Sequence, residues 1–290
     1  MIRRSSAPLR WRRTTIASLL VVVATAVSAA PAPSKAPGAA LRLVVAGVVD
    51  GRAEVGIEIA LEPGWKTYWR TPGDAGIPPA VDWSKSTGIA RLDLRFPAPV
   101  RFEEEGTFSI GYTAPVILPV DLALAAPTEP ANLVLDVQIG LCHDICLPLS
   151  ARLTGTVSPT APVDAAAAAR LAEARARLPL PATKGVAPWV MSLERDPDSI
   201  PGAVLVKVKM PEDETGAAGR DVLVEGPTGD WSLPLPERIA TARGREIWRF
   251  DLDGIPRGAR LEGSELRFTM RIGDRVVEQK VTLDATAAAP

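Results

Sequence analysis

Apolar and polar residues alternate in short stretches along most of this 290-residue chain. Val55, Ile57, Ile59 and Leu61, for example, alternate with polar or small residues. A period of two puts one set of side chains on each face of a strand, so this stretch predicts a half-buried β-strand. Comparable stretches predict further strands at 92–96, 133–139, 152–157, 204–208, 247–252, 266–272 and 277–283, whereas the run at 116–124 is apolar on both parities and predicts a more buried strand.

One segment in the middle of the chain has a different composition. Alanine and arginine, which favour helix, dominate residues 165–178; Asp164 can cap the start and Pro179 can end the helix. Strands with frequent turns on both sides predict an all-β fold. We expect two β-sandwich domains, at about 40–158 and 185–286, joined by a helical linker at 159–184. The 23 glycines and 28 prolines supply turns and exclude a helical bundle.

The N-terminal segment, residues 1–30, has the composition of a secretory signal peptide. Five arginines and no acidic residue accompany an apolar run at about 16–27, and small residues follow at 28–30. An uncleaved anchor is the alternative, but about twelve apolar residues are short for a bilayer of about 30 Å. Five of the 33 basic residues and none of the 34 acidic ones lie in this segment, so its removal would change the formal charge from −1 to about −6. We expect export to the periplasm of a Gram-negative cell.

Charge and composition exclude several classes of function. The charge balance leaves no basic surplus for nucleic acid. A single histidine disfavours a Ser-His-Asp triad or a histidine-rich metal site. The acidic run Glu103-Glu104-Glu105 is typical of a solvated loop, so no hydrolase is expected. We also expect no small-molecule cofactor.

The candidate chemistry lies in two cysteines, Cys142 and Cys146, with His143 and Asp144 between them. In an exported protein such a pair usually forms a disulfide. A structural staple is one interpretation, although closing so short a loop stabilises by only about 2 kcal/mol. An extended strand would hold the two Cα atoms about 13 Å apart, whereas a disulfide needs about 4.4–6.8 Å. The chain must therefore bend at 143–145, and we expect a turn of helix at a domain edge, where a partner thiolate could reach a sulfur.

The residues between the cysteines suggest modulation or metal binding. A protonated His143 would favour the thiolate form of a neighbouring cysteine, and Asp144 would disfavour it. Cys142, His143 and Cys146 are also soft ligands, so a copper-handling protein is a further hypothesis. Structural zinc is disfavoured because it normally needs four ligands.

Several separated motifs resemble one family. They are Gly64-Trp65-Lys66-Thr67-Tyr68-Trp69-Arg70-Thr71-Pro72-Gly73-Asp74-Ala75-Gly76-Ile77-Pro78-Pro79, Asp82-Trp83, Phe96-Pro97-Ala98-Pro99, Gly111-Tyr112 and Leu141-Cys142-x3-Cys146-Leu147-Pro148. In this order they resemble the N-terminal periplasmic region of the DsbD/ScsB thiol–disulfide interchange proteins. The ScsB-type branch, with two immunoglobulin-like modules, is the most similar. The resemblance is strongest over 64–148 and mostly architectural in the second half.

The resemblance implies a redox function. The family's cysteine pair maps onto Cys142 and Cys146, which would receive electrons from a membrane-embedded domain. They would pass them to oxidised periplasmic proteins, such as thioredoxin-like proteins, disulfide isomerases or cytochrome maturation factors. A cap segment shields the pair in this family; Tyr68 and Trp69 are candidates, with core packing as their alternative.

The family's membrane and thioredoxin-like domains have no counterpart in this sequence, so we expect a separate membrane electron carrier. The chain would then be one component of a protein-disulfide reductase system. Two other hypotheses stay open. One is a non-catalytic protein-interaction module with a structural disulfide. The other is copper handling, which is associated with the ScsB-type branch.

Overall fold

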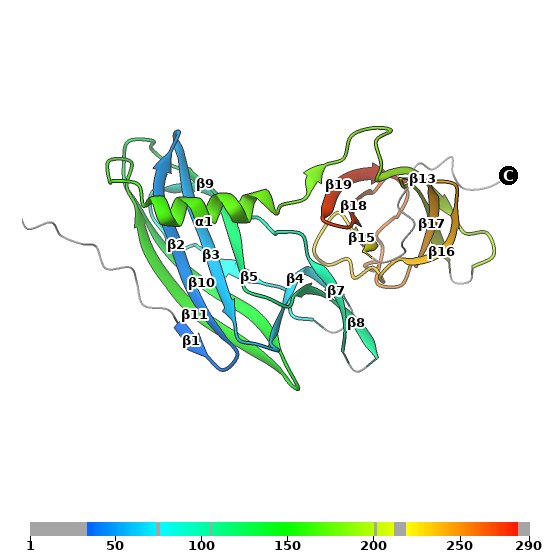
Figure 1. Ribbon diagram of the computed structural model, residues 1–290, viewed down its shortest axis with the longest axis horizontal. Helices are drawn as coiled ribbons and strands as arrows, with labels where there is room; N and C mark the ends of the chain where they lie inside the picture. The colour runs from blue at the N-terminus through cyan, green and yellow to red at the C-terminus, as the bar shows by residue number, and fades with distance from the viewer. Residues whose placement is uncertain (1–33, 74–75, 105, 200–201, 212–218, 284–290) are drawn as a thin grey trace, which may run out of the picture. The chain divides into compact units, whose positions relative to one another are not determined.

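Two sheets form a first β-sandwich from residues 34–157 of the computed structural model (Figure 1). The structure describes residues 34–73, 76–104, 106–199, 202–211 and 219–283, so the predicted signal peptide lies outside the described residues. The strands of its first sheet are, in spatial order, β1 (Ser34–Ala36), β2 (Ala39–Val49), β3 (Arg52–Leu61), β9 (Val116–Leu124) and β6 (Ile89–Leu94). Those of its second sheet are β11 (Cys146–Val157), β10 (Ala131–Cys142), β4 (Lys66–Gly73), β8 (Thr107–Tyr112) and β7 (Val100–Glu104), with β5 (Ala80–Asp82) paired to β10.

The core of this sandwich follows the predicted alternation. Ile57 and Ile59 of β3 are buried against Leu135 and Ile139 of β10 in one hydrophobic cluster. Because successive side chains of a strand point to opposite faces, these alternating residues fix which face of each sheet is buried.

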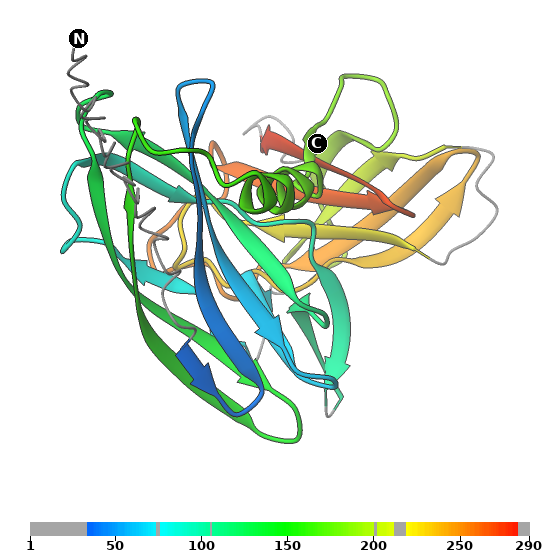
Figure 2. The ribbon, with the colours of Figure 1, turned by 60° about the vertical axis from the view of Figure 1, so that its left-hand side comes forward.

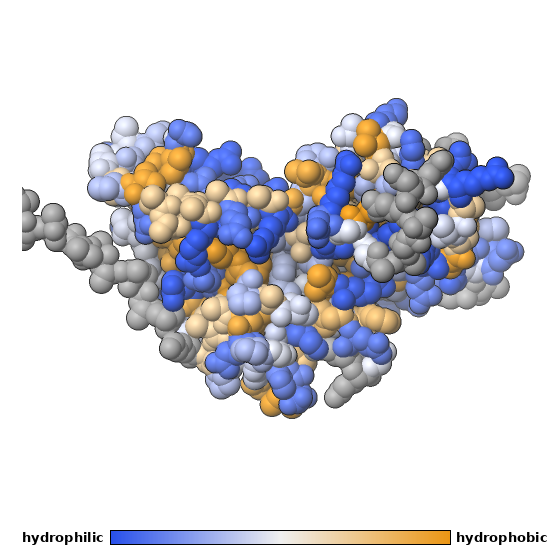
Figure 3. Space-filling view, viewed as in Figure 1, coloured by the Kyte–Doolittle hydropathy of each residue, from blue (hydrophilic) through white to orange (hydrophobic). Residues whose placement is uncertain are grey.

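A helix, α1 (Ala165–Ala176), follows the first sandwich and packs onto it. Asp164 caps its start by accepting hydrogen bonds from the backbone N–H groups of Ala166 and Ala167. Its contacts are with β2, β3 and β9, where Leu171 is fully buried. Over this helix, Figure 3 shows pale orange, mildly hydrophobic residues next to blue, hydrophilic ones. The linker helix is therefore docked on the first sandwich by a buried leucine.

Two four-stranded sheets form the second sandwich. One contains β12 (Leu180–Pro181), β19 (Arg275–Thr282), β18 (Glu265–Ile272) and β15 (Arg220–Glu225) in spatial order. The other contains β13 (Trp189–Arg195), β14 (Ala203–Lys209), β17 (Arg245–Asp251) and β16 (Glu237–Ala242). Val206, Trp248, Phe268 and Met270 are in its core. The all-β prediction with two immunoglobulin-like sandwiches and a helical connection is thus confirmed.

Side chains of the second sandwich contact the first directly. Arg101 of β7 forms an ion pair of 2.7 Å with Asp221 of β15, and Arg70 of β4 forms one with Glu225. Leu223 belongs to the hydrophobic cluster of the first sandwich. No helix among the described residues is long and apolar enough to cross a membrane.

Candidate functional site

The two cysteines lie at the two ends of a hairpin turn. Cys142 is the last residue of β10 and Cys146 the first of β11, and the ladder pairs them directly. Figure 2 shows the hairpin as two long green strands beside β2 and β3. The expected turn of helix is wrong: residues 143–145 form a bend between strands, with the His143 N–H donating to the Ile145 carbonyl at 3.3 Å. The ladder continues to the turn although the alternation of β10 stops before it, since residues 139–142 are all buried.

This pairing brings the two sulfurs together. The Sγ atoms of Cys142 and Cys146 are 2.6 Å apart, and a disulfide bond of about 2.05 Å is a short movement away. Cys142 is 5% exposed, whereas Cys146 is exposed to solvent. Cys146 is therefore the residue of the pair that a partner in solution would reach.

Tyr68 on the neighbouring strand contacts this pair. β4 pairs with β10 through Thr67–Leu141 and Lys66–Cys142, which places the next residue, Tyr68, beside the hairpin end. Its hydroxyl oxygen lies 3.2 Å from the Cys146 sulfur. A thiolate sulfur has no proton to donate, so with Cys146 ionised the tyrosine hydroxyl is the donor.

Glycines make room for the Tyr68 ring. A Cβ atom on Gly140 would lie 2.7 Å from the ring, and one on Gly76 would lie 2.5 Å from it. The Phe102 ring of β7 lies 6.3 Å from the Tyr68 ring, centroid to centroid. Phe102 was not predicted as part of the site; Gly140, which interrupts an apolar strand, and Gly76 are the signals in the sequence for this enclosure.

Trp69 has a different environment from Tyr68. It is 1% exposed, belongs to the hydrophobic core of the first sandwich, and carries the Arg70 guanidinium 4.1 Å above its ring. Of the two residues considered for a cap, Tyr68 contacts the cysteine pair and Trp69 packs in the core.

His143 and Asp144 form a pair in the turn. The Nδ1 atom of His143 lies 2.8 Å from a carboxylate oxygen of Asp144, and its ring lies 5.5 Å from the Trp65 ring. The described residues contain no group of three or more His, Cys, Asp or Glu side chains arranged to hold a metal ion. The three-ligand copper site suggested by Cys142, His143 and Cys146 is therefore not assembled here.

Comparisons with known proteins point to one family. Residues 36–158 match the family model described as "Thiol:disulfide interchange protein DsbD, N-terminal". The crystal structure of the N-terminal periplasmic domain of ScsB from Proteus mirabilis is similar, with a TM-score of 0.66 and 19% identity over 87% of this chain and 97% of that chain. No curated protein sequence matches this chain significantly. The first sandwich, which carries the cysteine hairpin, is thus a DsbD/ScsB-type N-terminal domain.

Proposed function

We propose that this chain is a periplasmic thiol–disulfide exchange protein that passes electrons between a membrane reductant and disulfides of periplasmic proteins. The observation that carries the proposal is the asymmetry of the cysteine pair: the two sulfurs are 2.6 Å apart, with Cys142 buried and Cys146 exposed. An exposed cysteine beside a buried one suits exchange through a mixed disulfide, which depends on access to the attacking or attacked cysteine. The family match supports the class of reaction, and the periplasmic origin of the ScsB domain supports the compartment.

The exchange proceeds in two substitutions at sulfur. The Cys146 thiolate attacks a partner disulfide, forms a mixed disulfide, and one partner sulfur leaves as a thiolate with the electron pair of the broken bond. Cys142, having lost its proton to solvent, then attacks the Cys146 sulfur and releases the second partner thiolate. The chain ends as the Cys142–Cys146 disulfide and the partner as a dithiol. A membrane reductant reverses these steps by delivering two electrons and two protons.

Residues around Cys146 offer a contact surface for such a partner. Ile145, next to Cys146 in the turn, is 63% exposed. Ile77, which lies against the Gly140 position in β10, is 42% exposed. Apolar side chains beside an accessible sulfur suit docking of a thioredoxin-like protein or a disulfide isomerase.

A purely structural disulfide would contribute little at this position. The cysteines close a hairpin whose two strands already pair over the 12 residues of β10. A structural disulfide stabilises a fold mainly by reducing the entropy of the unfolded chain. This gain is smallest for a short loop such as the one between Cys142 and Cys146. The hairpin thus favours exchange over the interaction-module alternative.

The reduction potential of the pair tests the proposal. We expect a value above about −300 mV, within the range of exchange proteins, by equilibration with glutathione or dithiothreitol buffers. A potential well below this value would indicate a structural disulfide. A double Cys142→Ser, Cys146→Ser variant that keeps cellular function would indicate the same.

Addition of Cu(I) to the reduced protein tests the copper hypothesis, since stoichiometric binding lost in that double variant would favour it.

A further inference from the structure

The strand that carries Tyr68 leaves its sheet directly after that residue. Between β4 and β8 the ladder pairs Thr67 with Tyr112 and Tyr68 with Gly111, and resumes only at Gly73, which pairs with Ser109. Residues 69–72 of β4 therefore bulge out opposite the single residue Ile110. Ladder hydrogen bonds to β8 do not hold this bulge, so its position depends on side-chain contacts.

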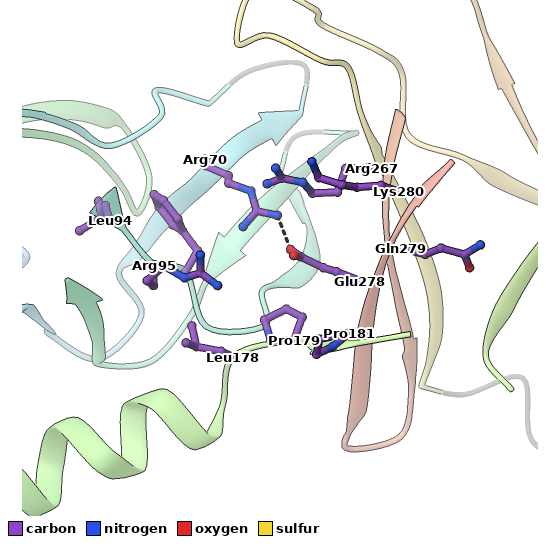
Figure 4. A pocket seen from close by; sticks show the side chains of 11 residues that line it. Arg70, Leu94, Arg95, Leu178, Pro179, Pro181, Arg267, Glu278, Gln279 and Lys280 are labelled. Carbon is purple, nitrogen blue, oxygen red and sulfur yellow. Dashed lines mark hydrogen bonds and ion pairs between the residues drawn. The ribbon is translucent and has the colours of Figure 1, made fainter. Parts of the chain in front are cut away.

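Trp69, at the start of the bulge, is buried in the core of the first sandwich, and the polar contacts of Arg70 and Thr71 come from the second sandwich. Arg70 donates from Nε and Nη2 to the two carboxylate oxygens of Glu225 at 2.8 and 2.7 Å, and from Nη2 to Glu278 at 2.5 Å. The Thr71 hydroxyl donates to Glu225 at 2.9 Å. Figure 4 shows Arg70 reaching toward Glu278 of β19 across a pocket of about 390 Å³.

This clamp is poorly accessible to water. The side chains of Arg70 and Glu225 are 20% and 10% exposed. Burial lowers the pKa of Arg70, but the hydrogen bonds and charges of Glu225 and Glu278 outweigh burial and raise it. Bidentate arginine–carboxylate pairs fix geometry as well as charge, so the bulge is held in one position.

Gly76 packs closely against both the Tyr68 ring and the end of the bulge. A Cβ atom on Gly76 would lie 2.3 Å from the Pro72 Cβ and 2.5 Å from Cδ1 of Tyr68. Gly76 thus lies between Pro72, at the end of the bulge, and the Tyr68 ring. A displacement of the bulge would loosen the wall that holds Tyr68 in place.

We propose that Arg70, clamped by Glu225 and Glu278 of the second sandwich, is a positioning residue that fixes the Tyr68 hydroxyl against the Cys146 sulfur. The second sandwich then has a defined task, which is to hold the strand beside the redox pair. The importance of this positioning for electron transfer rests on the proposed function. The positioning itself does not, because it is measurable on the isolated full chain with a small thiol reagent.

The test is the rate at which iodoacetamide alkylates Cys146 at pH 7, in a Cys142→Ser background with one thiol. Loss of a hydrogen bond to the Cys146 thiolate raises the pKa of the thiol and lowers the thiolate fraction about tenfold. Because a thiolate of higher pKa is more nucleophilic, the alkylation rate falls by less than this. We expect Arg70→Met to slow alkylation by up to about threefold, and Glu225→Gln by less. Arg70→Met in a Tyr68→Phe background should have no further effect, because the hydroxyl through which Arg70 acts is absent.

A control separates positioning from a generally weakened contact between the sandwiches. Arg271 donates to the Pro99 carbonyl at 2.8 Å, so Arg271→Met weakens the same contact away from β4 and should leave the rate unchanged. Circular dichroism and thermal melting establish that each variant is folded. The proposal is overturned if folded Arg70→Met alkylates at the wild-type rate or faster. It is also overturned if the slowing persists without the Tyr68 hydroxyl, or if Arg271→Met slows alkylation equally.

Discussion

The hydroxyl of Tyr68 lies 3.2 Å from the sulfur of Cys146, although the two residues are 78 positions apart in the sequence. β4 and β10 pair at Lys66 and Cys142, so the sheet itself brings tyrosine and cysteine together. The contact involves the exposed cysteine of the pair, which is the one a partner would reach. Tyr68 is therefore the residue best placed to adjust the reactivity of the exchange site.

Removal of the Tyr68 hydroxyl should make Cys146 less reactive. In Tyr68→Phe the ring stays in place, but the thiolate loses a donor, so alkylation at pH 7 in the Cys142→Ser background should slow by about threefold. Tyr112→Phe is the matched control, because it removes a buried hydroxyl that donates to the Pro97 carbonyl at 2.8 Å. It should lower the melting temperature without changing the alkylation rate. If Cys146 is alkylated at the same rate with and without the Tyr68→Phe change in the Cys142→Ser background, the assigned contact is contradicted.

A methyl group on Gly140 should displace Tyr68. The added Cβ would lie 2.7 Å from the ring and 2.9 Å from the Ile77 Cβ, so one of them must move. Overpacking of this kind costs about 1–3 kcal/mol, and we expect Gly140→Ala to lower the melting temperature and to slow Cys146 alkylation as Tyr68→Phe does. Gly229→Ala is the control, since a Cβ there meets nothing within 4 Å. Unchanged stability and reactivity in Gly140→Ala would show that the ring is not enclosed as described.

Leu171 should hold α1 on the first sandwich. It is fully buried with Val44, Ala46 and Ala167 in a cluster between the helix and the sheet. Leu→Ala in such a site costs about 2–5 kcal/mol, so amide hydrogen exchange over residues 165–176 should accelerate by at least about tenfold. Leu180→Ala, at a position 60% exposed, should leave this exchange unchanged. If Leu171→Ala exchanges like the wild type, the helix is not docked through this residue.

Acid should weaken the cysteine hairpin through Asp136. Hydrogen bonds from Arg152 of β11 and from Lys85 hold the pKa of Asp136 well below its ordinary value of 3.8. A carboxylate whose pKa is lower in the folded protein than in the unfolded chain stabilises the fold at pH values above its ordinary pKa. This stabilisation is lost as the pH falls toward the lower, folded-state pKa. Between about pH 5 and pH 2 the wild type should therefore lose more of its melting temperature than Asp136→Asn. An equal loss of melting temperature in both proteins would show that Asp136 does not contribute to the acid sensitivity. The expected difference is small because the Asp136 carboxylate is exposed to solvent.

Much of the fold was readable from the sequence because most buried strands alternate with a period of two. Val204, Val206 and Val208 are buried, as the alternation in that strand predicts. The strands at 66–73 and 107–112 escaped prediction. In β4, Thr67, Tyr68 and Trp69 are buried in succession, so the strand shows no alternation.

The site was predictable only in part, for a related reason. Cys142 and Cys146 stood out by spacing, but residues 139–142 are all buried, so no alternation near the cysteines indicated the hairpin that replaced the expected helical turn. The clamp of Arg70 on Glu225 was not predictable, because the two residues are 155 positions apart and lie in different sandwiches. Pairings of that kind depend on tertiary packing, which local patterns do not encode.

Trapping of a mixed disulfide tests the central claim most directly. In Cys142→Ser the resolving sulfur is absent, so attack by Cys146 on the disulfide of an oxidised thioredoxin-like protein should stop at the mixed disulfide. We expect a species of the summed mass on a non-reducing gel, sensitive to dithiothreitol, formed through Cys146 and absent from the double Cys→Ser variant. We expect less of it from Cys146→Ser, whose remaining Cys142 is 5% exposed. Absence of any mixed disulfide with thioredoxin-like proteins or disulfide isomerases, together with a reduction potential well below about −300 mV, would contradict the exchange function.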